Sequence, residues 1–209
     1  MDGKVSYEHS TIDLDGEILC LPLDEAFFLY GSLVESQIST LLQEEKNPYS
    51  LYTLSQAKTP LFFHIEEGKK VSLQIVYVQT TKNALSPCFM QWYLGKNTVA
   101  NISTSCLVLD PSFEGMQLQT ALVSLEEKAE LHWIDERKDL RQKRSESTFR
   151  ALLKKEAKVY KSSFSESQAF FSEEACIKLS GEKAHAEVSS LLLAEKEDKK
   201  SMKILMEHI

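Results

Sequence analysis

The sequence predicts an all-β protein: a right-handed parallel β-helix preceded by a small N-terminal helical segment. A short phrase with an alanine after a charged residue recurs at Lys128–Trp133, Glu156–Lys161, Glu174–Leu179 and Lys183–Val188. Its alanines are separated by 28, 18 and 9 residues, close to multiples of nine, which predicts coils of about nine residues. A strand that recurs after a tight turn is typical of a solenoid, in which each coil buries its apolar face against its neighbours. Because such scaffolds present surfaces to other proteins, the pattern favours a scaffold over an enzyme.

The chain is expected to divide into a helical or irregular cap, residues 1–48, and a β-helix, residues 49–209. Apolar residues repeat at helical spacing over Leu23–Gln43, which predicts a helix there. Gly31 weakens its middle and is expected to divide it into two. Pro48 cannot continue a helix, so the helical segment is expected to end before it.

From Tyr49 onwards the apolar period changes to two. Val71, Leu73 and Ile75 alternate with polar neighbours, which is the pattern of a half-buried strand. Turn signals recur about every eight to twelve residues, which favours an all-β fold, although a β-sandwich has the same spacing. Leu140–Glu156 also contains good helix formers. The expected strands are 61–65, 71–78, 87–94, 99–109, 116–125, 129–134, 147–153, 159–164, 169–171, 175–179, 184–193 and 202–206.

Composition restricts the classes of function. The formal net charge of −7 disfavours non-specific binding to nucleic acid, which needs lysine and arginine. The basic run Arg137–Arg144 contains Asp139 and is expected to be a solvated turn rather than a phosphate or RNA patch. No apolar run approaches the roughly 20 residues that span a bilayer, and the amino terminus shows no secretory signal. Four scattered cysteines without a CxxC pair predict a cytoplasmic protein with reduced thiols.

Few residues are candidates for chemistry. The sequence has neither a GxSxG nucleophile elbow nor a phosphate-binding loop, so we expect no catalytic and no cofactor-binding residue. His132 and His185 are expected to be outward-facing members of a ladder. His208 is the one candidate metal ligand, because a Glu207-His208 pair can coordinate iron. Cys176 is expected to face the interior of a coil and to pack as a small hydrophobe.

In the last part of the chain, Gly181–Ala194 is followed by a polar turn and by Met206-Glu207-His208. This order resembles the SufB and SufD proteins of iron–sulfur cluster assembly, in which a similar phrase leads through an apolar strand and a polar turn to a strand that closes on a histidine. The resemblance covers roughly residues 47–208 and is closer to SufD than to SufB. The other segments that resemble this family are Leu51–Ala57 and Pro60–Gly68, at the opening of the β-helix, and Leu122–Trp133 and Ser145–Leu153, in intervening coils.

The resemblance implies a non-catalytic scaffold that pairs with a SufB-like subunit and recruits a SufC-like ATPase. The complex, rather than this chain, would assemble the iron–sulfur cluster. SufD relatives continue beyond the histidine that matches His208, so the chain resembles their N-terminal half. The continuation carries the family's functional histidine and the helical segment that docks the ATPase, and we transfer no catalytic residue. The family's acidic residue and threonine before this histidine are absent from Lys199–Leu205.

Two other classes of function stay open. One is a β-helix enzyme acting on polysaccharide, which the missing secretory signal disfavours. The other is a sandwich-type binding module without enzymatic activity. If the fold is a β-helix, the last coil near Met202–Ile209 is expected to self-associate, because an unpaired strand edge can pair with a strand of another molecule. Neither nucleic acid nor a membrane is an expected partner.

Overall fold

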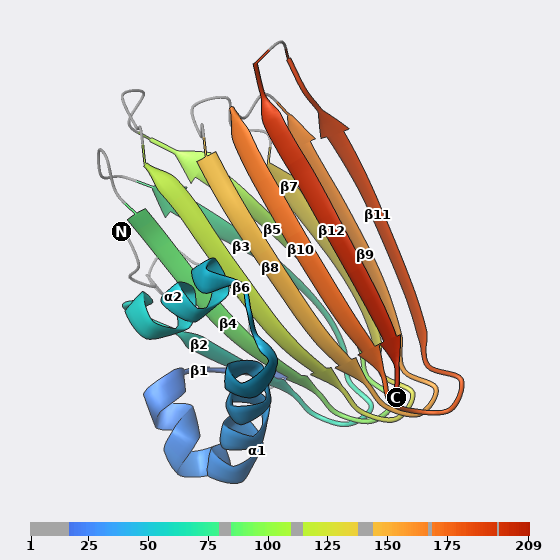
Figure 1. The fold of residues 1–209 in the computed structure, drawn as a ribbon. Helices are drawn as coiled ribbons and strands as arrows, with labels where there is room; N and C mark the ends of the chain where they lie inside the picture. The colour runs from blue at the N-terminus through green and yellow to red at the C-terminus, as the bar shows by residue number, and fades with distance from the viewer. Residues whose placement is uncertain (1–16, 80–84, 110–114, 138–143, 167–168, 196) are drawn as a thin grey trace.

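The computed structural model describes residues 17–79, 85–109, 115–137, 144–166, 169–195 and 197–209, and two parallel sheets face each other in it as a β-solenoid (Figure 1). The predicted fold class is therefore confirmed. Sheet A contains, in spatial order, β1 (Ile18–Pro22), β2 (Leu61–Ile65), β4 (Leu85–Leu94), β6 (Met116–Leu125), β8 (Arg144–Leu153), β10 (Phe170–Leu179) and β12 (Lys199–His208). Sheet B contains β11 (His185–Leu193), β9 (Lys158–Glu166), β7 (Glu130–Arg137), β5 (Val99–Val108) and β3 (Lys70–Gln79).

One coil of the solenoid is about three times as long as the predicted nine residues. Each coil contains one strand of each sheet, so a residue stacks on the one that lies a whole coil further along the chain. The prediction of nine-residue rungs is wrong, because it counted single strands as coils. In sheet A the stacked residues Leu61, Met90, Ala121, Phe149, Ala175 and Ile204 are separated by 29, 31, 28, 26 and 29 residues.

The recurring alanine phrase marks the turn from sheet A to sheet B. Ala129, Ala157 and Ala184 each follow a residue in the left-handed backbone region, whereas Ala175 lies inside β10. Ala129 and Ala157 are fully buried, and their backbone amides each close a turn. A small side chain is needed where the turn folds onto the core. The left-handed residues of the five turns are Gly68 (φ 77°) and Asn97, Lys128, Glu156 and Lys183 (φ 56–60°).

Hydrogen bonds join these turns from coil to coil. The amide of Asn97 donates to the carbonyl oxygen of Glu127 over 3.1 Å, and the amide of Lys128 donates to that of Lys155 over 3.0 Å. The turns therefore form a stack of their own, beside which the C-terminus lies (Figure 1). The backbone amides and carbonyls of the turns thus form hydrogen bonds with one another, and the hydrogen-bonded ladders of the two sheets stay intact.

Aromatic side chains fill the solenoid interior near this turn stack. The rings of Phe63 and Trp92 stack with centroids 3.9 Å apart. Trp133 meets Trp92 edge-on at 5.6 Å and Phe149 at 5.5 Å. These four side chains come from four successive coils and both sheets, and each is at most 2% exposed. The contacts thus fasten neighbouring coils to one another by burial of large apolar surfaces.

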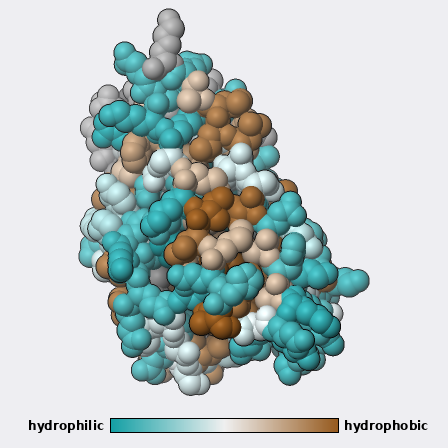
Figure 2. Space-filling model, turned by 45° about the vertical axis from the view of Figure 1, so that its right-hand side comes forward, coloured by the Kyte–Doolittle hydropathy of each residue, from teal (hydrophilic) through white to brown (hydrophobic). Residues whose placement is uncertain are grey.

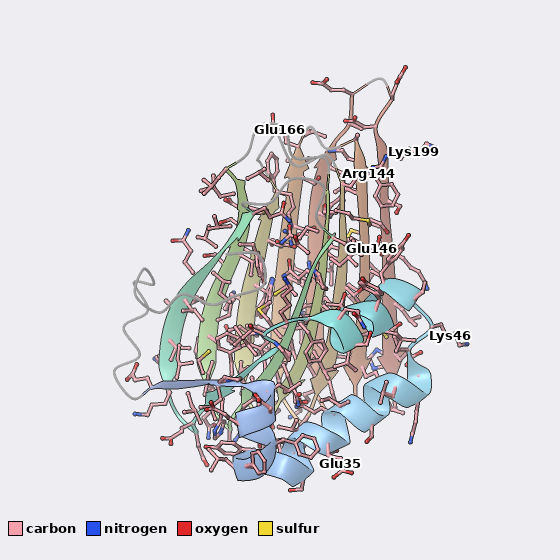
Figure 3. The ribbon with its side chains drawn as sticks, turned by 90° about the vertical axis from the view of Figure 1, so that its left-hand side faces the viewer. Glu35, Lys46, Arg144, Glu146, Glu166 and Lys199 are labelled. Carbon is pink, nitrogen blue, oxygen red and sulfur yellow. The ribbon has the colours of Figure 1, made fainter. Side chains whose placement is uncertain are left out.

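Two helices, α1 (Leu23–Glu44) and α2 (Pro48–Gln56), cover part of the outer face of sheet A (Figure 3). The predicted helix over Leu23–Gln43 is confirmed, with a kink at Tyr30 beside Gly31. Pro48 begins α2 rather than the solenoid, because proline fits the first turn of a helix. The sequence also missed β1, which pairs antiparallel with β2. None of the helices in the described residues has the length and apolar character needed to cross a bilayer.

His64 lies between α1 and sheet A, where it makes the fold sensitive to pH. Its ring centroid is 5.1 Å from that of Tyr30 and 5.3 Å from that of Tyr93. Burial lowers the pKa of His64, although the charge of Glu66 opposes this shift. The unfolded chain therefore binds the proton more readily than the folded protein does, and stability must fall as the pH drops from about 7 through this lowered pKa.

We expect the melting temperature to decrease between pH 7 and pH 5, and to decrease less in His64→Phe, which keeps the ring but cannot bind a proton. Thermal unfolding followed by circular dichroism at both pH values measures the difference. An equal decrease in both proteins would contradict a role for His64.

Candidate interaction surface: the open end of the solenoid

The solenoid has an open end, formed by the outer edges of β11 and β12 and by the side chains that these two strands direct inward. β11 pairs only with β9, and β12 pairs only with β10, among the residues that the structure describes. Each strand therefore presents one row of unpaired peptide groups. Two parallel strand edges at the end of a packed core are a template for another chain.

Apolar side chains accompany these free edges. Ile204 and Met206 stack on the buried Ala175 and Ile177, yet they are 45% and 41% exposed, since no coil among the described residues covers them. Figure 2 brings the side with β11 and β12 forward and shows a band of apolar side chains flanked by hydrophilic ones. The exposed apolar residues of these two strands and the C-terminus are Leu191, Leu193, Ile204, Leu205, Met206 and Ile209.

The interior is polar in the half that lies away from the turn stack. Arg137 is 1% exposed, and its guanidinium binds the carboxylate of Asp135 at 3.1 Å and the side-chain oxygens of Gln117 and Gln119. Thr104 also donates to this carboxylate, with 2.8 Å between its hydroxyl and Oδ1 of Asp135. The prediction that Arg137 belongs to a solvated turn is wrong, while 138–143 lie outside the described residues.

One coil further, Lys161 and Glu173 form a second buried pair. Their side chains are 1% and 0% exposed, and the ammonium donates to one carboxylate oxygen of Glu173. Lys200 follows at the open end, where its ammonium reaches the carbonyl and hydroxyl oxygens of Ser165 at 3.3 and 3.4 Å. Burial lowers the pKa of Lys200, because the charged form loses water there. These residues form an interior polar column that runs to the open end.

The buried thiol and phenol beside this column are held in their neutral forms. Burial raises the pKa of Cys88 to about 11, and burial raises that of Tyr77 well above its ordinary value. Burial also disfavours the charge of Arg137, but the combined effect of Asp135, Cys106 and Tyr77 outweighs burial and raises the pKa of the guanidinium. At neutral pH the thiol of Cys88 beside the column is therefore protonated, and a protonated thiol is a poor nucleophile.

An outer groove of about 490 Å³ lies between α1 and sheet A. Its apolar floor includes Leu122 and Leu152, and Arg150 closes one side by binding the carboxylates of Glu45 and Glu174 at 2.8 Å. Burial acts to raise the pKa of Glu45, but its hydrogen bonds to Arg150 and to the backbone amide of Asn47 outweigh burial, and the pKa is lowered. This cluster fastens the junction of α1 and α2 to β8 and β10.

The structure gives His208 and Cys176, the candidate residues from the sequence, different surroundings. His208 is exposed at the end of β12 and occupies the inward position that Leu179 fills in the preceding coil. Within the described ranges, no three metal-ligating side chains come together, so His208 is not part of such a group there. Cys176 does not face the interior: it is half-buried and lines the outer groove beside Arg150.

The two ladder histidines agree with their prediction. His132 stacks on Tyr160 of the neighbouring coil with ring centroids 4.8 Å apart, and it contacts Glu130 at 2.8 Å. His185 meets the same tyrosine at 5.7 Å. Both imidazoles therefore belong to an outward ladder on sheet B.

Sequence reasoning missed the interior polar column, although a signal was present. Lys161 lies two residues after Val159, and Glu173 lies between Phe171 and Ala175. Alternation places each charged residue on the same face as its apolar neighbours, which is the inner face of the strand.

Comparison with known proteins does not assign the chain to a family: no family model matches this chain, and no curated protein is significantly similar to it.

Proposed function

We propose that this chain is a SufD-like scaffold component of an iron–sulfur cluster assembly complex. It pairs with a SufB-like subunit and recruits a SufC-like ATPase in the cytoplasm, and it performs no catalytic step itself. The sequence resemblance over residues 47–208 supports the choice of family. A β-solenoid suits this role because contacts between successive coils make it a stiff body that moves as a unit.

The observation that carries the proposal is the parallel β-solenoid itself, because another β-solenoid can pair with strand edges of this kind. The exposed side chains of Ile204 and Met206 can contact such a partner. Main-chain hydrogen bonds would provide affinity, and the side chains between the strands would provide specificity. Iron and sulfide would be cargo assembled by the complex, so no resident metal site is required in this chain.

Co-expression tests this proposal. We expect an affinity-tagged chain to co-purify with a SufB-like and a SufC-like protein from the same genome. The double variant Ile204→Asp/Met206→Asp should abolish co-purification of the SufB-like subunit, because it buries two unpaired charges in the interface. Phe28→Asp on α1 is the control, since Phe28 is 89% exposed and lies on the helical cap.

Circular dichroism of each variant establishes that it remains folded. The proposal is wrong if neither subunit co-purifies with the wild-type chain. Retention of the SufB-like subunit by the folded double variant would show instead that the open end is not the pairing surface.

A further inference from the structure

The outer groove between α1 and sheet A has the size of a small-molecule site. Its volume is about 490 Å³. Ligand pockets usually have volumes of roughly 300–1,000 Å³ and a mainly apolar lining. Leu122 on β6, Leu152 on β8 and Cys176 on β10 belong to the floor, on the outer face of sheet A. Leu33 and Thr40 line the groove from α1. A sheet and a helix thus enclose an apolar space between them.

The charges around the groove are balanced. Five cationic and five acidic side chains line it. Lys154 binds Glu126 at 2.7 Å, and Lys178 binds Glu44. Arg150 binds two further carboxylates of the lining, as part of the cluster that fastens the helices to the sheet. An anionic ligand would meet as many carboxylates as cations, and a cationic ligand the reverse. The groove therefore favours a neutral molecule, which leaves these ion pairs intact.

One buried donor in the wall of the groove lacks an acceptor. Gln37 lines the groove from α1 and is 9% exposed. Its side-chain oxygen accepts a hydrogen bond from the amide nitrogen of Gln91. Its own amide nitrogen has no hydrogen-bond partner within the part of the chain that the structure describes. A buried donor without a partner is unfavourable, so an acceptor on a ligand gains a hydrogen bond here without displacing an existing one.

We propose that the outer groove binds a neutral, mainly apolar small molecule that carries a hydrogen-bond acceptor, and that Gln37 recognises this acceptor. The apolar body of the ligand contacts Leu122 and Leu152, and its acceptor receives the free N–H of Gln37. An apolar lining with a few placed polar groups is the usual design of such sites. Binding in this groove does not require a SufB-like or a SufC-like subunit, so the site is additional to the proposed scaffold role.

Nile red tests the site, because it is neutral, planar and mainly apolar, carries a carbonyl acceptor, and fluoresces more strongly in apolar surroundings. We expect the full chain to bind it saturably. Leu152→Trp should weaken binding by about tenfold or more, because the larger ring fills the space above the floor. Gln37→Met keeps the length of the side chain but removes the donor, and it should weaken binding about fivefold. Ser36→Ala is the control, since Ser36 is an exposed residue of the same wall and binding should not change.

The thiol of Cys176 reports where the probe binds, because it lines the groove. Saturating Nile red should slow the reaction of this thiol with N-ethylmaleimide several-fold, as measured by mass spectrometry of the peptide that contains it. The double variant Ile204→Asp/Met206→Asp removes exposed apolar side chains from the open end. It should bind Nile red with the affinity of the wild type.

Circular dichroism establishes that each variant is folded, and the protection of Cys176 in the wild-type chain tests the site even if Leu152→Trp does not fold. Absence of saturable binding, or equal reactivity of Cys176 with and without Nile red, overturns the site. So does loss of binding in Ile204→Asp/Met206→Asp with retention in a folded Leu152→Trp, which would place the probe at the open end. Wild-type affinity in Gln37→Met overturns recognition of the acceptor. None of these measurements involves another subunit, so their outcome is separate from that of co-purification.

Discussion

Replacing Lys161 by methionine is expected to destabilise the protein by about 3–5 kcal/mol, because it leaves the carboxylate of Glu173 buried without its cation. Both side chains are at most 1% exposed, and the ammonium also lies 5.6 Å from the ring centroid of Phe149. The solenoid cannot admit water to this position without separating its coils. Urea denaturation followed by circular dichroism measures the loss as a decrease in the free energy of unfolding.

Two further variants distinguish the effect of the unpaired charge on stability from the effect of the changed packing. Lys161→Met/Glu173→Leu removes both charges, and we expect it to regain most of the lost stability, since apolar replacements of a buried ion pair are often neutral or stabilising. Lys158→Met lies in the same strand and breaks a surface pair with Glu130, whose partners are 47% and 30% exposed. Its cost should stay below about 1 kcal/mol. A double variant no more stable than Lys161→Met would show that the packing, not the unpaired charge, causes the loss.

Gly181→Ala is expected to cost about 1–3 kcal/mol, because its methyl group has no room. A Cβ at this position would lie 2.0 Å from the backbone nitrogen of Lys155 in the preceding coil. The atom in its way belongs to the main chain, so the two turns must move apart. The turn that contains Gly181 is one residue longer than the turn before it, between Leu153 and Ala157. Glycine lets this extra residue lie directly against the neighbouring turn.

Gly31→Ala provides the control for this variant. No atom lies within 4 Å of a Cβ built there, and the residue is part of α1. Alanine is favoured over glycine in helices by up to about 1 kcal/mol, so the control should be neutral or stabilising. The midpoint of urea denaturation compares the two variants under the same conditions. If Gly181→Ala matches the wild type, the turns of adjacent coils are not in close contact.

The local elements of this fold, its strands, a recurring turn and a helix, could be predicted from the sequence. Alternation such as Val71, Leu73 and Ile75 predicted strands with one buried face, and the structure buries the first two of them. The charged residue before Ala129, Ala157 and Ala184 marked a recurring turn, although the chain alone did not show that this residue adopts a left-handed backbone. The helix over Leu23–Gln43 and its division near Gly31 were also predictable, because helix periodicity and glycine act over a few residues.

The length of a coil and the state of each strand edge were decided only by the tertiary structure. Stacking joins residues 26–31 positions apart, and no local pattern records which strand will lie beside which. The same stacking buries Arg137 and Lys161, which composition alone assigns to the surface. Among the described residues it pairs β12 with β10 alone. Periodicity depends on the chain's own geometry, whereas pairing and burial depend on which coils the folded protein brings into contact.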